Sequence, residues 1–280
     1  MTDDMPSPPK STPRSSSGGG LFRPSLQAPG RATDRCIGRL QALYRQKESS
    51  AAAALARLRR GVGKTVHEAP ESWGNDGLEE LSAIRAEHDS AEDVEPGDGA
   101  SAKYYSAEER YWSEQRELAE EKAVFLAITL WALHQQSIRD ANMHAHDWGL
   151  GRSVRHLAQG RSIGGEPQPT TSVVKLNEEL NEPIRKRFVR IGTSTSFEML
   201  GTRLREMVLL LRGARLPLDY ARLADQLAAW QDTARQAEVR RTWGRDFHLS
   251  AQRRSRSSEA GPAVDGDNRA GLDDLLNADD

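Results

Sequence analysis

The sequence predicts an all-α protein built from two small helical-bundle lobes with disordered N- and C-terminal tails. Apolar residues recur three and four positions apart through most of the chain, which is the spacing of one helix face, and the alternation typical of strands is nearly absent. Ser or Asp residues precede several of these apolar runs, and Gly follows several of them, as at helix starts and stops. These observations together favour bundled helices over any sheet.

Three segments have the composition of unfolded chain. Only 37% of the 280 residues are hydrophobic, and the polar excess is concentrated in residues 1–30, 87–106 and 255–280. The first is rich in Pro, Ser and Gly, and the other two are acidic. We therefore expect a disordered tail at 1–30, an N-terminal helical lobe at 31–160 with an acidic insertion at 87–106, a C-terminal helical lobe at 168–254, and an acidic tail at 255–280.

The N-terminal lobe is expected to contain four main helices. Asp34 is predicted to cap the first, and Cys36 lies on it as a small core residue. The second, at 51–60, stops at Gly61, and a short third helix spans 78–86. Ser106 and Glu109 form a capping box that opens a long helix, whose apolar middle at 123–133 should be the buried centre of the bundle. A short helix near 154–157 follows a turn-rich stretch.

The C-terminal lobe follows a linker at 160–169. We expect separate helices at 173–180 and 183–191, with Pro183 tolerated as the first residue of the second one. Thr195 is predicted to open the next helix through a capping box with Glu198, and Gly213 closes it. Asp219 should cap the helix that follows. The last helix should bury the side chains Val239, Trp243 and Phe247.

Charge is strongly segregated along the chain, although the net charge is only -2. Residues 1–66 carry 12 Lys/Arg against 4 Asp/Glu, and residues 139–256 carry 21 against 13. Residues 67–122 carry 5 against 17, and residues 257–280 carry 1 against 7. Basic folded faces beside acidic segments are typical of a nucleic-acid binder. The alternative is that solvated helices simply need charge.

No residue pattern predicts an enzyme or a cofactor site. The run from Gly61 to Thr65 lacks the earlier glycine of a phosphate-binding loop and follows a helix rather than a strand, so it predicts a helix stop. One cysteine excludes a disulfide framework within the chain. No run is long and apolar enough to span a membrane, and the N-terminus lacks a signal sequence, so we expect a soluble, cytoplasmic protein.

His144 and His146, with Asp140 and Asp147 nearby, suggest a metal site at first sight. Histidines two apart on a helix point to different sides, whereas zinc ligands converge on one point. The chain also has no HExxH pattern and no cysteine cluster. We therefore predict no metal site, and we expect His134 and His156 to be interior or boundary residues.

Clusters of basic residues are the positive functional signal. Guanidinium groups suit phosphate because their forked donors match its oxygens, and no interleaved aromatic residues indicate base readout. Any single arginine is as well explained by a solvated ion pair. The candidate residues for binding nucleic-acid backbone are Arg57, Arg59, Arg60, Lys64, Arg139, Arg152, Arg155, Arg185, Lys186, Arg187, Arg190, Arg240, Arg241 and Arg245.

Four stretches of the chain resemble the CasB family, the small subunit of the type I-E CRISPR surveillance complex Cascade. They are LARLRRGVGK with EAPESWG (55–74), LWALHQQS (130–137), GLGRSVRHLA (149–158), and the run from LREMVLLLRG to VRRTWGRDFH (204–248). The resemblance covers roughly residues 31–249. Both tails and the acidic insertion depart from the family pattern.

The resemblance implies a non-enzymatic helical subunit without cofactors. Members of the family pack as two copies along the complex, where they stabilise the guide RNA–target DNA heteroduplex and the displaced strand. The implied partners are the other Cascade subunits, guide RNA, target DNA and a second copy of the chain. The alternative that the residues leave open is an assembly scaffold whose basic faces contact only neighbouring proteins.

Overall fold

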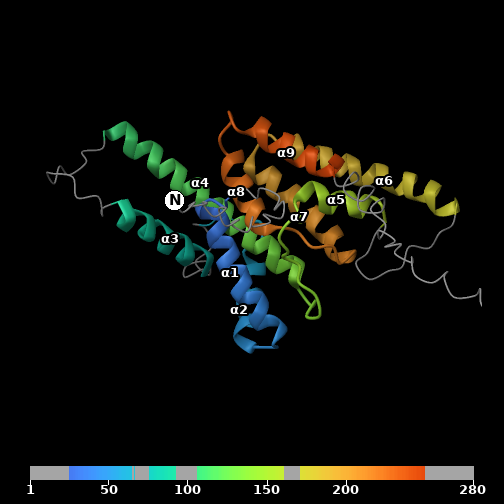
Figure 1. Cartoon of the computed structure of the whole chain (residues 1–280), viewed down its shortest axis with the longest axis horizontal. Coiled ribbons are helices and arrows are strands. Elements are labelled where there is room, and N and C mark those ends of the chain that lie inside the picture. The colour runs from blue at the N-terminus through green and yellow to red at the C-terminus, as the bar shows by residue number, and fades with distance from the viewer. Residues whose placement is uncertain (1–24, 65, 67–75, 93–105, 161–170, 250–280) are drawn as a thin grey trace, which may run out of the picture.

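The prediction of an all-α fold is confirmed by the computed structural model, which describes residues 25–64, 66, 76–92, 106–160 and 171–249 (Figure 1). Every regular element in these ranges is an α-helix. The predicted tails beyond residues 25 and 249, most of the acidic insertion and the predicted linker lie outside the described residues. The helices are α1 (Ala28–Arg45), α2 (Ser49–Arg60), α3 (Asp76–Glu92), α4 (Ala107–Gln135), α5 (Leu150–Ala158), α6 (Thr171–Gly192), α7 (Phe197–Gly213), α8 (Tyr220–Trp230) and α9 (Gln236–Leu249).

Helix α4 runs through the centre of the molecule, as its apolar middle predicts. It begins with the expected capping box, in which Ser106 and Glu109 each accept the other's backbone N–H. Its C-terminal half is buried on nearly all sides, and Trp131 is fully enclosed. Helices α1, α2, α7 and α8 all pack against it. The first half of α4 extends beside α3, away from the other helices (Figure 1).

The first helix begins earlier than predicted and is capped from another helix. Asp225 on α8 accepts the backbone N–H groups of Gln27 and Gly30, at 2.9 and 2.6 Å. These are donors that the first turn of a helix leaves without an intrahelical partner. A Cβ atom at Gly30 would lie 2.5 Å from the Asp225 carboxylate, so glycine is needed there. The prediction that Asp34 caps this helix is wrong, because Asp34 lies inside α1.

Helices from both predicted lobes share one hydrophobic core. Helix α8 packs on α1 and α4, and α5 packs on α6, α7 and α9. The buried apolar cluster runs without a break from α1 to α9. Its members include Ile37, Ile128, Leu204, Leu223 and Trp243. Among the described helices, the core is therefore continuous across the expected boundary between the two lobes.

Three further boundaries differ from the sequence-based expectations. Helix α3 continues to Glu92, so the first part of the predicted insertion is helical, and Glu87 pairs with Arg35 of α1 at 3.1 Å. Pro183 lies inside a single α6 rather than at the start of a second helix. The cap of α7 is Ser196, which accepts the N–H of Met199, and not Thr195.

Candidate nucleic-acid interface

Helices α5 and α9 approach closely because residue 151 has no side chain. A Cβ atom on Gly151 would lie 2.1 Å from the carbonyl oxygen of Trp243 and 2.5 Å from the backbone nitrogen of Phe247. Any larger residue would force the two helices apart. The second glycine of the GLG sequence that opens α5 thus serves helix packing. The close approach sets the basic side chains of α5 beside those of α9.

An aromatic stack extends this contact to α6. The guanidinium of Arg155 lies over the ring of Phe247, 5.4 Å from its centroid, and Phe247 stacks on Phe188 of α6 with centroids 5.2 Å apart. Cation–π contacts of this kind fix the orientation of an arginine without neutralising its charge. We call the region where α5, α6 and α9 meet the basic corner. Most of the predicted basic residues lie on its three helices.

Several of the predicted cations already have partners on the protein. Lys186 pairs with Glu182 at 2.8 Å, and Arg187 pairs with Glu206 at 3.3 Å. These exposed ion pairs contribute little stability, and a phosphate can replace the carboxylate partner of either cation. The guanidiniums of three other arginines are oriented by contacts within the chain: Arg139 over Tyr44, Arg152 over Trp148, and Arg240 bonded to Gln236.

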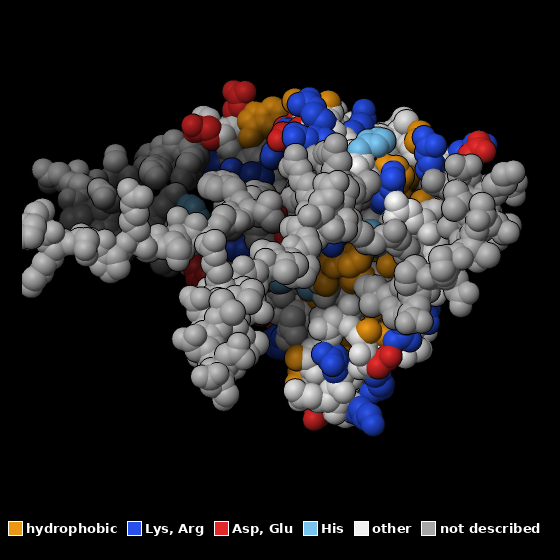
Figure 2. Space-filling model, turned by 45° about the vertical axis from the view of Figure 1, so that its right-hand side comes forward, with side chains coloured by type: hydrophobic (Ala, Val, Ile, Leu, Met, Phe, Trp, Pro, Cys, Tyr) orange, Lys and Arg blue, Asp and Glu red, His pale blue; other side chains and the backbone are white. Residues whose placement is uncertain are grey.

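The remaining arginines of the basic corner point to solvent. Arg185, Arg190, Arg241 and Arg245 are exposed, and none forms a hydrogen bond or ion pair through its side chain with another described residue. Figure 2 shows Lys and Arg side chains over the upper surface, at the height where Figure 1 places α6 and α9. Unpaired guanidiniums on adjacent helices are suited to contact successive phosphates of a strand.

A second basic group lies at the end of α2. Helix α2 stops at Gly61 as predicted, and the turn that follows carries Lys64. Arg57, Arg59 and Arg60 form no ion pair with another described residue. This group is separate from the basic corner, because α2 packs on α1 and α4 and not extensively on α5, α6 or α9. In Figure 2 it corresponds to the cationic lower end of the molecule. The predicted residues therefore form two surfaces.

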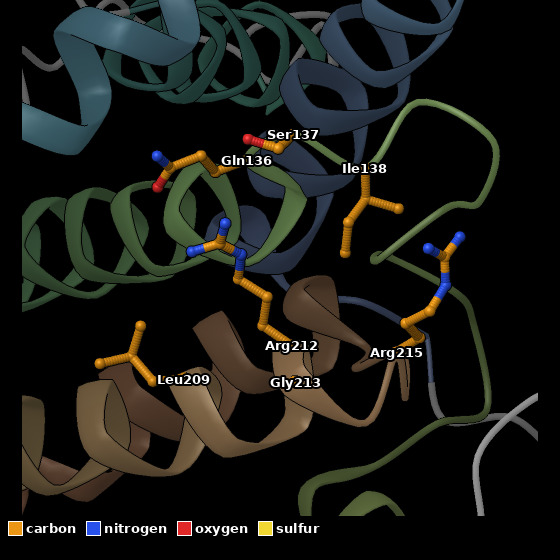
Figure 3. Close-up of a pocket in the computed structure, with 7 residues that line it drawn as sticks. All are labelled: Gln136, Ser137, Ile138, Leu209, Arg212, Gly213 and Arg215. Atoms are coloured by element: carbon orange, nitrogen blue, oxygen red, sulfur yellow. The ribbon is translucent and has the colours of Figure 1, made fainter.

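The structure adds two arginines that the sequence interpretation did not include. Arg212 and Arg215 line a hollow of about 420 Å³ between the ends of α4 and α7, together with Gln136, Ser137 and Ile138. Figure 3 shows Arg212 reaching from α7 toward the end of α4. Arg215 pairs with Asp140. A basic residue in the last turn of a helix is ordinary because it complements the helix dipole, so no sequence signal singled out Arg212.

The histidines of residues 143–148 converge rather than diverge. They lie in a turn, not on a helix, and the ligand atoms of Asp34, His144 and His146 lie within 4.8 Å of one another. However, Nδ1 of His144 accepts the N–H of Tyr220 at 3.1 Å, so the neutral ring carries its proton on Nε2, 3.0 Å from Asp34 Oδ1. A metal on Nε2 needs the opposite tautomer. The trio is therefore best explained as a hydrogen-bonded link between α1 and α8.

His134 and Tyr220 form a buried polar pair in the core. The two side chains lie 2.8 Å apart and are fully buried. Burial, together with the nearby charge of Arg212, lowers the pKa of His134 to about 3. Burial also raises the pKa of Tyr220. Both groups are therefore neutral near pH 7, and they connect the end of α4 to the start of α8, as expected for an interior histidine.

None of the described helices is long and apolar enough to cross a membrane.

Comparison with known proteins gives a consistent family assignment. The family model for the CRISPR-associated protein Cse2 matches residues 54–248. The crystal structure of CasB from Thermobifida fusca is 34% identical in sequence, covers 80% of this chain and 99% of its own, and has a TM-score of 0.57.

Two more distant structures also match. M. ruber CasB is 19% identical, covers 84% of this chain and 99% of its own, and has a TM-score of 0.48. A CRISPR-associated protein of the Cse2 family from Thermus thermophilus is 20% identical, covers 77% of this chain and 97% of its own, and has a TM-score of 0.45. The comparison with curated proteins found no match. The chain belongs to the Cse2 family of CRISPR-associated proteins, the CasB subunits of type I-E Cascade.

Proposed function

We propose that this chain is the non-catalytic small subunit of a type I-E Cascade complex and that its two basic surfaces bind nucleic-acid backbone. Bound there, it stabilises the guide RNA–target DNA heteroduplex and the displaced strand of the R-loop. The other Cascade subunits and a second copy of the chain are its partners in the cytoplasm. Family membership supports the place in the complex.

The observation that carries the backbone-binding proposal is the basic corner. Arg185, Arg190, Arg241 and Arg245 are exposed cations without ion-pair partners among the described residues, on helices locked together by Gly151 and Phe247. Rigid helices present guanidiniums at a small entropic cost. Among its described residues the corner offers charge and forked donors but no exposed aromatic platform for bases, so contact is expected with phosphates.

Weak backbone contacts suffice for this role. A heteroduplex is about as stable as the DNA duplex that it replaces, so R-loop formation is nearly balanced in free energy. A few phosphate contacts that form only when the strands separate will shift this balance. The contribution is independent of target sequence, because phosphates carry no base information.

The test is R-loop formation by a reconstituted complex that contains either the wild-type chain or a charge-reversed variant. We expect the double variant Arg59→Glu/Arg60→Glu and the double variant Arg185→Glu/Arg190→Glu each to weaken R-loop formation by a similar factor on unrelated target sequences. A loss that depends on target sequence would contradict backbone binding. Unchanged R-loop formation with both variants would instead support the scaffold function, in which the basic surfaces contact only neighbouring proteins.

A further inference from the structure

The first half of α4 and the helix α3 form an arm that the functions above do not use. In Figure 1 the first half of α4 extends away from the other helices on the same side of the molecule as α3, which packs along α1. None of residues 107–122 of α4 is buried, whereas burial is nearly continuous from Ala123 onward. At 1.5 Å per residue this half of the helix is about 24 Å long. We call α3 with residues 107–122 of α4 the acidic arm.

One arginine connects the two helices at the base of the arm. Arg85 of α3 forms hydrogen bonds with the carboxylates of Glu120 and Glu121 and with the backbone carbonyl of Glu117, at distances between 2.8 and 3.2 Å. Leu81 and Ile84 of α3 are buried beneath it, and α3 packs along α1. Several bonds from one partly buried guanidinium fix the register of the two helices. The base of the arm thus has a defined packing of α3 against α4.

The outer face of the arm carries an exposed aromatic pair. Tyr111 and Trp112 are 53% and 62% exposed, and their rings meet edge to face at 5.4 Å. At 100° per residue they lie on the side of α4 opposite Glu117 and Glu120, which face α3. The end of helix α8 reaches this side at Ala119, whose carbonyl accepts a bond from Gln231. The aromatic pair lies about 10 Å beyond that point.

The charge of the arm selects the class of partner. Helix α3 contains six Asp/Glu and one Arg, and residues 107–122 contain six Glu, two Arg and one Lys. This field repels phosphate, so nucleic acid is excluded as the ligand. It attracts a basic protein surface, and exposed Tyr and Trp are the residues that most often anchor protein–protein interfaces.

We propose that the acidic arm docks on a neighbouring protein subunit of the complex through Tyr111 and Trp112, which enter an apolar pocket rimmed by Lys and Arg. This inference rests on the proposed place in Cascade and adds the surface by which the chain is held there. The same chain then uses opposite charges for its two tasks: acidic helices for protein and basic helices for nucleic acid.

The test uses the full chain and its cognate complex purified without this subunit. We expect Tyr111→Ala/Trp112→Ala to weaken incorporation into the complex by about tenfold or more. Glu108→Lys/Glu114→Lys should weaken it too, and raised salt should weaken wild-type incorporation. Val189→Ala, which truncates an apolar side chain that is 61% exposed on α6, is the matched control and should incorporate normally.

The controls separate this inference from the proposed function. Both arm variants should keep the helical content of the wild-type chain, because Tyr111 and Trp112 are far from the buried core and Glu108 is exposed. Tyr111→Ala/Trp112→Ala should also keep the wild-type DNA affinity because it changes no charge, whereas Glu108→Lys/Glu114→Lys removes carboxylates that repel phosphate and should raise that affinity. Wild-type incorporation of Tyr111→Ala/Trp112→Ala would overturn the inference. Loss of self-association instead of incorporation would show that a second copy is the partner, and would also overturn it. Failure of the wild-type chain to incorporate would contradict the proposed function itself.

Discussion

The guanidinium of Arg155 on α5 lies over the ring of Phe247 on α9, with Cζ 5.4 Å from the ring centroid. Phe247 in turn stacks on Phe188 of α6, so one aromatic ring connects the three helices of the basic corner. The residues that carry charge and the residues that hold the helices together alternate along the same elements. Packing at this corner and binding by it are therefore expected to fail together.

Gly151→Ala tests the close packing that forms the corner. The new Cβ atom would overlap the backbone of Trp243 and Phe247, so α5 and α9 must separate. We expect the free energy of unfolding to fall by about 1–3 kcal/mol, as in other overpacked sites. Chemical denaturation of both proteins measures this loss.

The matched control is Gly244→Ala on α9, where no atom lies within 4 Å of the new Cβ. Alanine is a better helix former than glycine, so this variant should be as stable as wild type or more stable, by up to about 1 kcal/mol. Equal stability of Gly151→Ala and Gly244→Ala would contradict the packing role of residue 151.

The buried His134 predicts a loss of stability in acid. Its folded pKa of about 3 lies below the ordinary value of 6.5, so the unfolded chain binds the proton first as the pH falls. Stability is therefore fully present above pH 6.5 and decreases as the pH falls toward 3. We expect His134→Gln to have a shallower decline over this range. An identical pH dependence of unfolding in both proteins would show that His134 is not buried in its neutral form.

The contribution of Asp225 to stability should depend on pH with the opposite sign. Burial raises the pKa of this carboxyl from 3.8 to about 6, although the N–H groups of Gln27 and Gly30 oppose the shift. The folded chain therefore binds the proton more tightly than the unfolded chain, and this group's contribution to stability falls as the pH rises from 3.8 to about 6. We expect the stability of Asp225→Asn, measured relative to wild type, to increase across this interval. Parallel stability curves would contradict the raised pKa.

The ion pairs of Arg85 are expected to stabilise the acidic arm. Arg85→Ala would leave Glu117, Glu120 and Glu121 close together without the cation that neutralises them. We expect amide hydrogen exchange in residues 107–122 to accelerate, while exchange in 123–135 stays slow because that half of α4 is buried. Arg110→Ala, on the same helix, is the control. Unchanged exchange in 107–122 would show that the ion pairs do not stabilise the arm.

The sequence was sufficient for the elements that depend on local signals. The Ser106 cap, the stop at Gly61, the Asp219 cap and the apolar centre of α4 are all read from neighbouring residues, and all are confirmed. The errors concern contacts between distant parts of the chain. Asp34 is of a residue type that often caps helices. However, the first turn of α1 is capped by Asp225, which is distant in the sequence. Pro183 is compatible with a helix start, yet α6 continues through it.

The candidate site shows the same limit. The sequence indicated that basic residues accumulate on α2, α5, α6 and α9, but not which of them meet. That arrangement depends on Gly151 and Phe247, whose roles exist only once α5 and α9 are in contact. The convergence of His144 and His146 on Asp34 was missed because helix geometry was applied to two histidines that lie in the predicted turn-rich stretch. Arg212 was missed because a basic residue in the last turn of a helix is common and signals no binding site.

The salt dependence of DNA binding by the full chain tests the central claim most directly. The logarithm of the affinity for single-stranded DNA should fall linearly with the logarithm of the salt concentration. Each phosphate contact should add about 0.7 to the steepness of this slope. We expect the variant with Arg185, Arg190, Arg241 and Arg245 changed to Ala to bind more weakly and with a smaller slope. The control, Arg110→Ala/Arg116→Ala on the acidic arm, should match wild type. The same slope in wild type and in the four-arginine variant, or no DNA binding by the wild-type chain, would contradict the account.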